Sequence, residues 1–88
     1  MTRQFTFSQR FQKSFMALAA QEKKQLKNKL ELLAQNPIHP SLRTKRIQGT
    51  DGLYESSINM DIRVIWYFED NVTIILADVG HHDILKQF

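Results

Sequence analysis

The sequence predicts an α+β domain in which a two-helix hairpin packs on a twisted, mainly antiparallel sheet of about four strands. Two observations lead to this prediction. Residues 8–35 carry apolar side chains at helical spacing, whereas residues 53–79 hold segments rich in β-branched and aromatic residues, separated by turn-forming residues. Helices gathered in one part of the chain and strands in another favour helices on one side of an antiparallel sheet.

Length and composition limit the classes of protein that the chain can form. Its 88 residues, 42% of them hydrophobic, suit one small domain, which we assign to residues 1–88. The absence of cysteine excludes disulfides and cysteine-based zinc sites. No apolar run approaches the roughly 20 residues of a membrane span, and the N-terminal segment lacks the apolar stretch of a secretory signal, so we expect a cytoplasmic protein with no membrane partner. The net charge of +3 weakly favours an anionic partner, either nucleic acid or an acidic protein.

The N-terminal part of the chain predicts a strand and two helices. Gln4–Phe7 alternates polar and apolar residues, as an edge strand does, and Ser8 is a suitable N-cap for the next helix. A second helix is expected from about Gln21 to Gln35, with leucines toward the core and lysines on a solvated face. Aromatic and aliphatic residues recur at helical spacing in the first helix and predict core positions: Phe7, Phe11, Phe15 and Leu18.

The rest of the chain predicts strands joined by turns. Leu42–Ile47 holds three cations between two aliphatic residues, and we expect a strand with Arg43 and Lys45 on one face and Arg46 on the other. Further strands are expected over residues 53–58, 61–68 and 72–79, of which the last is the most aliphatic and should lie inside the sheet.

One residue does not fit the composition of its strand. In Asp61–Tyr67, five of seven residues are β-branched or aromatic, but Arg63 lies among them. Alternation places Arg63 on the face opposite Ile62 and Val64. An unpaired buried guanidinium costs several kcal/mol, so Arg63 must reach a carboxylate, solvent, a cleft or an anionic ligand.

Two other groups could carry chemistry. The basic run Arg43, Lys45 and Arg46 is either a solvated edge strand or a binding surface. His81, His82 and Asp83 follow the last expected strand, where a histidine either caps the strand end or transfers a proton near neutral pH. The spacing does not favour a metal site, since His39 is the only other imidazole and no His-x-x-x-His pattern occurs. We therefore expect no metal and no cofactor.

Together these residue types suit metal-independent RNA cleavage. That reaction needs a base for the 2′-hydroxyl, a positive clamp for the phosphorane and an acid for the leaving 5′-oxygen. No glycine-rich phosphate loop, serine nucleophile motif or cysteine supports a different chemistry.

The order of elements and four segments of the sequence resemble the RelE/ParE superfamily of toxins from type II toxin–antitoxin pairs, and most of all its RelE/StbE and YafQ-like mRNA interferases. The segments are His39–Gly49, Gly52–Ser57, Asp61–Ile65 and Ile74–Asp83. The resemblance implies a ribosome-dependent endoribonuclease that cleaves mRNA in the A site, leaves a 2′,3′-cyclic phosphate and so inhibits translation. It also implies an acidic antitoxin partner that wraps the helix hairpin and sheet.

The resemblance also implies roles for residues. Arg63 matches the arginine that stabilises the phosphate, and His82 matches the histidine of a Gly-x-His-Asp motif that acts as general acid or base. Lys45 and Arg46 match basic residues near the scissile phosphate and the 16S ribosomal RNA, with Arg43 beside them. Asp83 is expected to orient a histidine, either His82 or His81.

The chain departs from the family pattern at two points. His81 replaces a small residue, often threonine, and Ile84-Leu85-Lys86 stands where an aromatic residue is common, so Phe88 is the candidate for stacking on a base. Two alternatives stay open: a ParE-like toxin that binds DNA gyrase, and a non-catalytic module that only binds an antitoxin.

Overall fold

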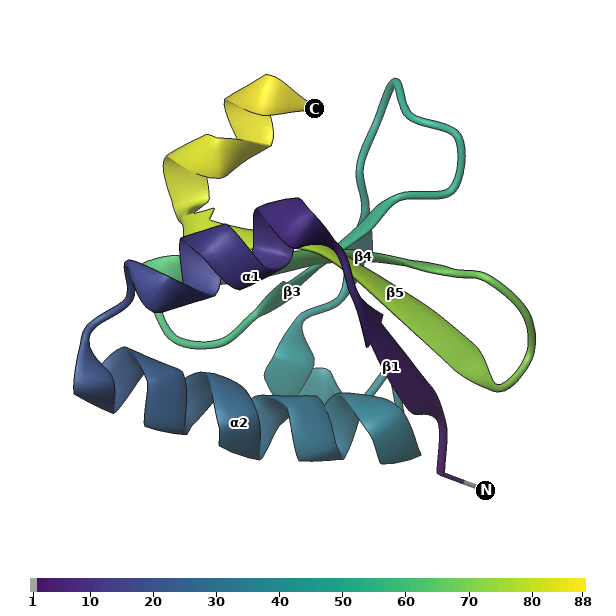
Figure 1. The fold of residues 1–88 in the computed structure, drawn as a ribbon. Coiled ribbons are helices and arrows are strands. Elements are labelled where there is room, and N and C mark those ends of the chain that lie inside the picture. Colours follow the sequence, from purple (N-terminus) through teal and green to yellow (C-terminus); the bar gives the residue numbers. More distant parts are fainter. Residues whose placement is uncertain (1) are drawn as a thin grey trace.

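A five-stranded sheet organises the fold (Figure 1), in the order β1-β5-β4-β3-β2. The computed structural model describes residues 2–88. β1 runs parallel to β5, and the other neighbours are antiparallel. This confirms the predicted α+β fold, with one strand more than expected. The strands are β1 (Gln4–Phe7), β2 (Lys45–Arg46), β3 (Tyr54–Ser57), β4 (Ile62–Phe68) and β5 (Thr73–His81).

Two α-helices and two 3₁₀ helices complete the fold: α1 (Gln9–Met16), α2 (Ala20–Gln35), η1 (Pro40–Leu42) and η2 (His82–Gln87). Ser8 is the N-cap of α1, as predicted, because its Oγ accepts a hydrogen bond from the Phe11 N–H at 3.0 Å. The same hydroxyl donates to the Ala77 carbonyl at 2.8 Å. One serine therefore both starts α1 and ties it to β5.

The core lies between the helices and one face of the sheet. Ile62, Val64 and Trp66 of β4 are at most 1% exposed and pack with Leu26 and Leu33 of α2. As predicted, alternate residues of β4 face the core.

The predicted core face of the first helix is only partly correct. Phe11 and Leu18 are buried in the core, and Phe15 packs against it partly buried. Phe7 is 48% exposed, so its prediction as a core residue was wrong. Phe7 lies at the end of the edge strand β1, where no further strand covers it, and it lines a groove between α1 and α2.

The opposite face of the sheet is covered in part by the C-terminal segment. Figure 1 shows η2, in yellow, on the other side of the sheet from α2. Ile65 is fully buried but lies outside the core cluster. Arg63 and Ile65 therefore belong to a second surface, which we call the outer face.

The predicted strand over Leu42–Ile47 is largely wrong. Pro40 opens η1, and Arg43 follows it in the left-handed region with φ 47°, so only Lys45 and Arg46 pair with β3. Thr44 Oγ1 donates to the Pro37 carbonyl at 2.6 Å, which stabilises this turn. Arg43 is thus not a strand neighbour of Lys45.

Within residues 2–88, no helix is both long and apolar enough to cross a membrane.

The turn between β4 and β5 generates a stability prediction. Asp70 Oδ1 accepts hydrogen bonds from the Val72 and Thr73 N–H groups, each at 2.8 Å. The hydrogen bond from the Val72 N–H is the main cause that holds the pKa of Asp70 below its ordinary value of 3.8. Loss of hydration raises this pKa in part, and hydrogen bonds from Thr73 lower it further. A lowered folded-state pKa contributes stability above pH 3.8 that is lost as the pH falls through the folded-state value.

We therefore expect Asp70→Asn to reduce the loss of melting temperature on acidification below pH 5, because the titrating group is gone. Thermal unfolding of both proteins across that range measures the effect. Asp51→Asn, in the exposed loop before β3, is the matched control. Identical pH profiles for wild type and Asp70→Asn would contradict the assignment.

Candidate functional site

Arg63 is held at the end of the sheet by the turn that precedes it. Its Nη1 donates to the carbonyls of Asn59, Met60 and Ile62, at 2.8, 3.2 and 3.1 Å. The side chain is 20% exposed. Nη2 makes no hydrogen bond within residues 2–88, so the guanidinium is oriented by one nitrogen and keeps donors on the other for a ligand.

Asn59 shapes this turn. Its Oδ1 accepts hydrogen bonds from the N–H groups of Asp61 and Ile62, at 2.8 and 2.7 Å. Its Nδ2 donates to Gln25 Oε1 on α2 at 2.7 Å. The carbonyls that Arg63 binds are therefore fixed by one asparagine anchored to α2.

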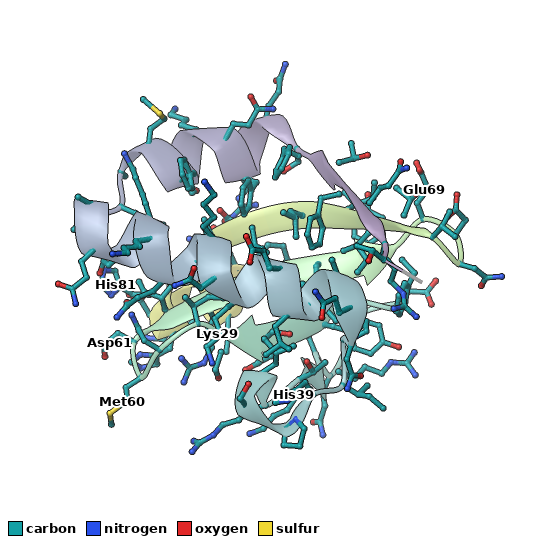
Figure 2. All side chains as sticks on the ribbon, turned by 90° about the horizontal axis from the view of Figure 1, so that it is seen from below. Lys29, His39, Met60, Asp61, Glu69 and His81 are labelled. Atoms are coloured by element: carbon teal, nitrogen blue, oxygen red, sulfur yellow. The ribbon has the colours of Figure 1, made fainter. Side chains whose placement is uncertain are left out.

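A cleft of about 400 Å³ opens beside Arg63, where α2, η1 and the β3–β4 turn meet. Figure 2 shows Lys29 on α2, with Met60 and Asp61 toward one end of the sheet and Glu69 at the other. Three of the lining side chains are cationic and none is a carboxylate, so the cleft favours an anion. It is lined by Lys29, Ser41, Arg43, Ser57, Ile58, Asn59, Met60 and Arg63.

Lys45 and Glu55 lie beside this cleft on the outer face. They are paired across β2 and β3, and Glu55 lies two residues before Ser57, which pairs with Arg63. Glu55 Oε1 is 4.0 Å from Arg63 Nε. Arg46 pairs with Tyr54, so alternation directs it toward the other face, as predicted.

The two histidines lie at the end of β5. His81 is the last strand residue and pairs with Ile62, and His82 begins η2. Both are exposed, as is Asp83. In the described part of the chain, no hydrogen bond or ion pair joins Asp83 to either imidazole, so the expected orientation by Asp83 is absent from this conformation. The residue of β5 that pairs with Arg63 is Gly80, whereas His81 pairs with the core-facing Ile62, so alternation directs the His81 side chain away from the outer face. His82 follows where η2 begins on the other side of the sheet from α2.

The C-terminal residue packs against α1. The Arg10 guanidinium carbon lies 5.0 Å from the centroid of the Phe88 ring, and Arg10 Nε is 2.9 Å from Asp78 Oδ2. Asp78 is only 3% exposed. Phe88 is therefore oriented by a cation that a buried carboxylate fixes.

The structure thus brings Arg63 and Arg43 together at one cleft, with Lys45 on the outer face. It places His81 at the end of the adjoining strand β5 and His82 at the start of η2. It adds Lys29, Glu55 and Asn59, which the sequence analysis did not single out. Asn59 had a local signal, since Asn-Met-Asp between two strands is a turn sequence. Lys29 and Glu55 had none, because only the tertiary fold brings them beside Arg63. In residues 2–88 no group of three or more potential ligand side chains could hold a metal ion.

Comparison with known families shows to which family the chain belongs. The profile described as the ParE toxin of the type II toxin–antitoxin system, parDE, matches residues 5–85. The chain belongs to this family. It is therefore a member of the RelE/ParE toxin superfamily, as the sequence segments indicated. A search of curated proteins found no match.

Solved structures confirm the RelE-like fold of this toxin family member. RelE of the Pyrococcus horikoshii RelE–RelB complex has a TM-score of 0.73 at 19% identity, over 92% of this chain and 96% of that one. YafQ of the E. coli DinJ–YafQ toxin–antitoxin complex has a TM-score of 0.75 at 20% identity, over 97% and 98%. YoeB from Staphylococcus aureus, solved as a dimer, has a TM-score of 0.77 at 17% identity, over 93% and 99%.

The junction between β5 and η2 generates a second prediction. Gly80 lies opposite Arg63, and a Cβ added there would lie 2.6 Å from Ile84 Cγ2. We expect Gly80→Ala to lower the free energy of unfolding by about 1–3 kcal/mol, as overpacking does. Adding Ile84→Ala should restore much of this loss because it removes the clashing methyl group.

Denaturant unfolding of the two single variants and the double variant closes a double-mutant cycle. Additive effects of the two substitutions would contradict the contact between Gly80 and Ile84.

Proposed function

We propose that this toxin cleaves mRNA in the ribosomal A site, without a metal ion, by attack of the RNA 2′-hydroxyl on the adjacent phosphate. The observation that supports this most is the Arg63 guanidinium, which is fixed by two carbonyls of the β3–β4 turn and by that of Ile62. It lies beside a cleft whose charged side chains are all cationic. Donors that are fixed before the reaction stabilise charge that develops in the transition state.

In the proposed reaction, Arg63 binds a non-bridging oxygen of the scissile phosphate and stabilises the phosphorane. O2′ loses its proton and bonds to phosphorus, and the P–O5′ bond breaks. His82 donates a proton to O5′, with His81 as the alternative donor beside it. The products are a 2′,3′-cyclic phosphate and a 5′-hydroxyl.

The remaining cations would hold the rest of the RNA. Arg43 borders the cleft, whereas Lys45 and Arg46 lie on the edge strand, exposed to an approaching polyanion. We assign these three to neighbouring phosphates and to 16S ribosomal RNA. Phe88 would stack on a base of the bound codon, with Arg10 holding its ring.

A second candidate function is inhibition of DNA gyrase by a ParE-like toxin, which the family match favours. The two histidines at the end of β5, the strand next to Arg63, favour RNA cleavage instead, because a gyrase inhibitor needs no proton donor at this position. A toxin-fold module that only binds its antitoxin is the third possibility.

The expected partner is an acidic antitoxin, and the structure has a suitable surface for it. A groove of about 750 Å³ runs between α1 and α2. Its apolar floor includes Phe7, Phe11, Phe15, Met16, Leu26 and Leu30, and its rim carries Lys23, Lys24 and Lys27. An apolar floor with a cationic rim fits an amphipathic segment that carries acidic residues.

The enzymatic proposal is tested with Arg63→Ala on ribosomes programmed with a defined mRNA, by mapping new 5′ ends. We expect cleavage at A-site codons by the wild type and a rate lower by about 10²–10³-fold in the variant, because a preorganised donor is lost. Lys13→Ala, which removes one exposed charge from α1, is the control and should cleave at the wild-type rate. Melting temperatures are compared because Arg63 also binds the turn.

Growth arrest without cleavage by the wild type would favour gyrase, to be followed by supercoiling assays. Neither arrest nor cleavage would favour a binding module.

The partner proposal predicts that Lys23→Glu with Lys27→Glu weakens binding to the acidic product of the adjacent gene. The loss should be about tenfold and should shrink as salt is raised, since rim charges are screened. Titration calorimetry at two salt concentrations measures it. Lys86→Glu on η2 reverses a charge on the other side of the sheet and should have little effect. The absence of a small neighbouring open reading frame would count against the partner itself.

A further inference from the structure

We propose that Glu55 is the general base that removes the proton from the RNA 2′-hydroxyl. This inference rests on the proposed RNA cleavage and assigns the one role that the proposed reaction leaves open. The geometry that supports it is the position of the Glu55 carboxylate on the outer face, beside the Arg63 guanidinium proposed to bind the phosphate. Glu55 Oε1 is 4.0 Å from Arg63 Nε, and the Glu55 side chain is 17% exposed.

The strand register places Glu55 between two cations. Lys45 pairs directly with Glu55, so their Cβ atoms lie about 5 Å apart on one face. Arg63 lies diagonally across from Glu55 on β4, two residues from the Ile65 that pairs with it. With the scissile phosphate on Arg63 and a neighbouring phosphate on Lys45, the nucleotide between them would therefore lie over Glu55. Since the 2′-hydroxyl is attached next to the scissile phosphate, this places the nucleophile near a proton acceptor.

The other carboxylates of this region are less suitable. Asp78 shares the outer face but is 3% exposed and is bound to Arg10 at 2.9 Å. Asp61 and Asp83 are exposed, and in the described part of the chain neither makes an ion pair with Arg63. Of the carboxylates in residues 2–88, Glu55 alone combines partial burial with an approach to the Arg63 guanidinium within 4.0 Å.

The assignment separates the two proton transfers on opposite sides of the phosphate. A Glu55 carboxylate oxygen takes the 2′ proton while O2′ bonds to phosphorus, and His82 gives its proton to O5′ as the P–O5′ bond breaks. Glu55 ends protonated and His82 ends neutral, and proton exchange with water restores both. A carboxylate that only neutralises Arg63 would instead hinder phosphate binding.

The first test is Glu55→Gln, measured by single-turnover cleavage on programmed ribosomes across a pH series. We expect the cleavage rate to fall by about 10²–10⁴-fold, the usual range for loss of a general base. Affinity for the programmed ribosome should be unchanged or higher, since a negative charge beside two cations is gone. The acidic limb of the pH–rate profile should disappear. Glu69→Gln, a carboxylate at the opposite end of the sheet (Figure 2), is the control.

A second substrate distinguishes base from acid. Replacing the 5′ leaving oxygen with sulphur produces a leaving group that needs no protonation. This mRNA should rescue cleavage by His82→Ala and should not rescue Glu55→Gln. Rescue of both variants, or of Glu55→Gln alone, would overturn the assignment.

Other outcomes are equally decisive. A Glu55→Gln protein that cleaves within about threefold of the wild type, or that loses ribosome affinity instead of rate, excludes Glu55 as the base. Loss of cleavage in Asp61→Asn or Asp83→Asn, with Glu55→Gln active, places the base elsewhere.

If the wild type does not cleave RNA at all, the proposed function fails and the role of Glu55 fails with it. If both the wild type and the Glu55→Gln variant cleave RNA, the proposed function stands and only the assignment of Glu55 as the base fails.

Discussion

The alternation of side chains along β4 is the constraint on which the site depends. Ile62, Val64 and Trp66 are buried beneath the helices, and their burial contributes much of the stability of a small core. Because neighbouring residues of a strand point to opposite faces, Arg63 must lie on the outer face. Ser57 and Gly80 flank it on β3 and β5. Two small neighbours leave room for the guanidinium to fold back onto the turn carbonyls.

A shift of register between β4 and β5 places Asp78 on the outer face as well. Ile65 pairs with Asp78 but Trp66 pairs with Leu76, so Ala77 has no partner on β4. Leu76 faces the core, and without the extra residue Asp78 would do so too. The irregularity instead directs Val79 to the core and Asp78 to the outer face, where Arg10 pairs with it. An unpaired carboxylate in the core would be costly, so the shift relieves an energetic penalty and orders the C-terminal contacts.

The sequence was sufficient for features that depend on local patterns. Helical spacing located α1 and α2, Ser8 was a recognisable N-cap, and the period of two in β4 predicted the face that carries Arg63. The apolar positions change from Ile74 and Leu76 to Val79, and this break in alternation is a local sign of the register shift. These features are set by neighbours within a few residues, so one sequence can reveal them.

The sequence was insufficient where a position depends on contacts distant along the chain. Leu42–Ile47 has the composition of a strand, but Thr44 bonds to Ser56 Oγ at 2.8 Å, and Ser56 accepts a bond from the Trp66 indole at 2.8 Å. This buried chain of hydrogen bonds stabilises the turn that directs Arg43 to the cleft. In the sequence, Lys29 cannot be distinguished from the solvated lysines of α2, because only the tertiary fold brings the β3–β4 turn to the same cleft. Glu55 gains its significance only from the register of three strands.

Helix α2 borders both the cleft proposed for RNA and the groove proposed for the antitoxin. Lys23 and Lys27 border the apolar groove, and Lys29 borders the cleft. An acidic segment that fills the groove and continues across α2 would reach Lys29 before it reached Arg63, which is tied to the turn on the outer face. Such a partner would inhibit by neutralising one wall of the cleft and by blocking approach to the ribosome, and the phosphate position itself would stay open. Such a partner would then prevent cleavage of ribosome-bound mRNA, while a short RNA could still bind in the cleft beside Arg63.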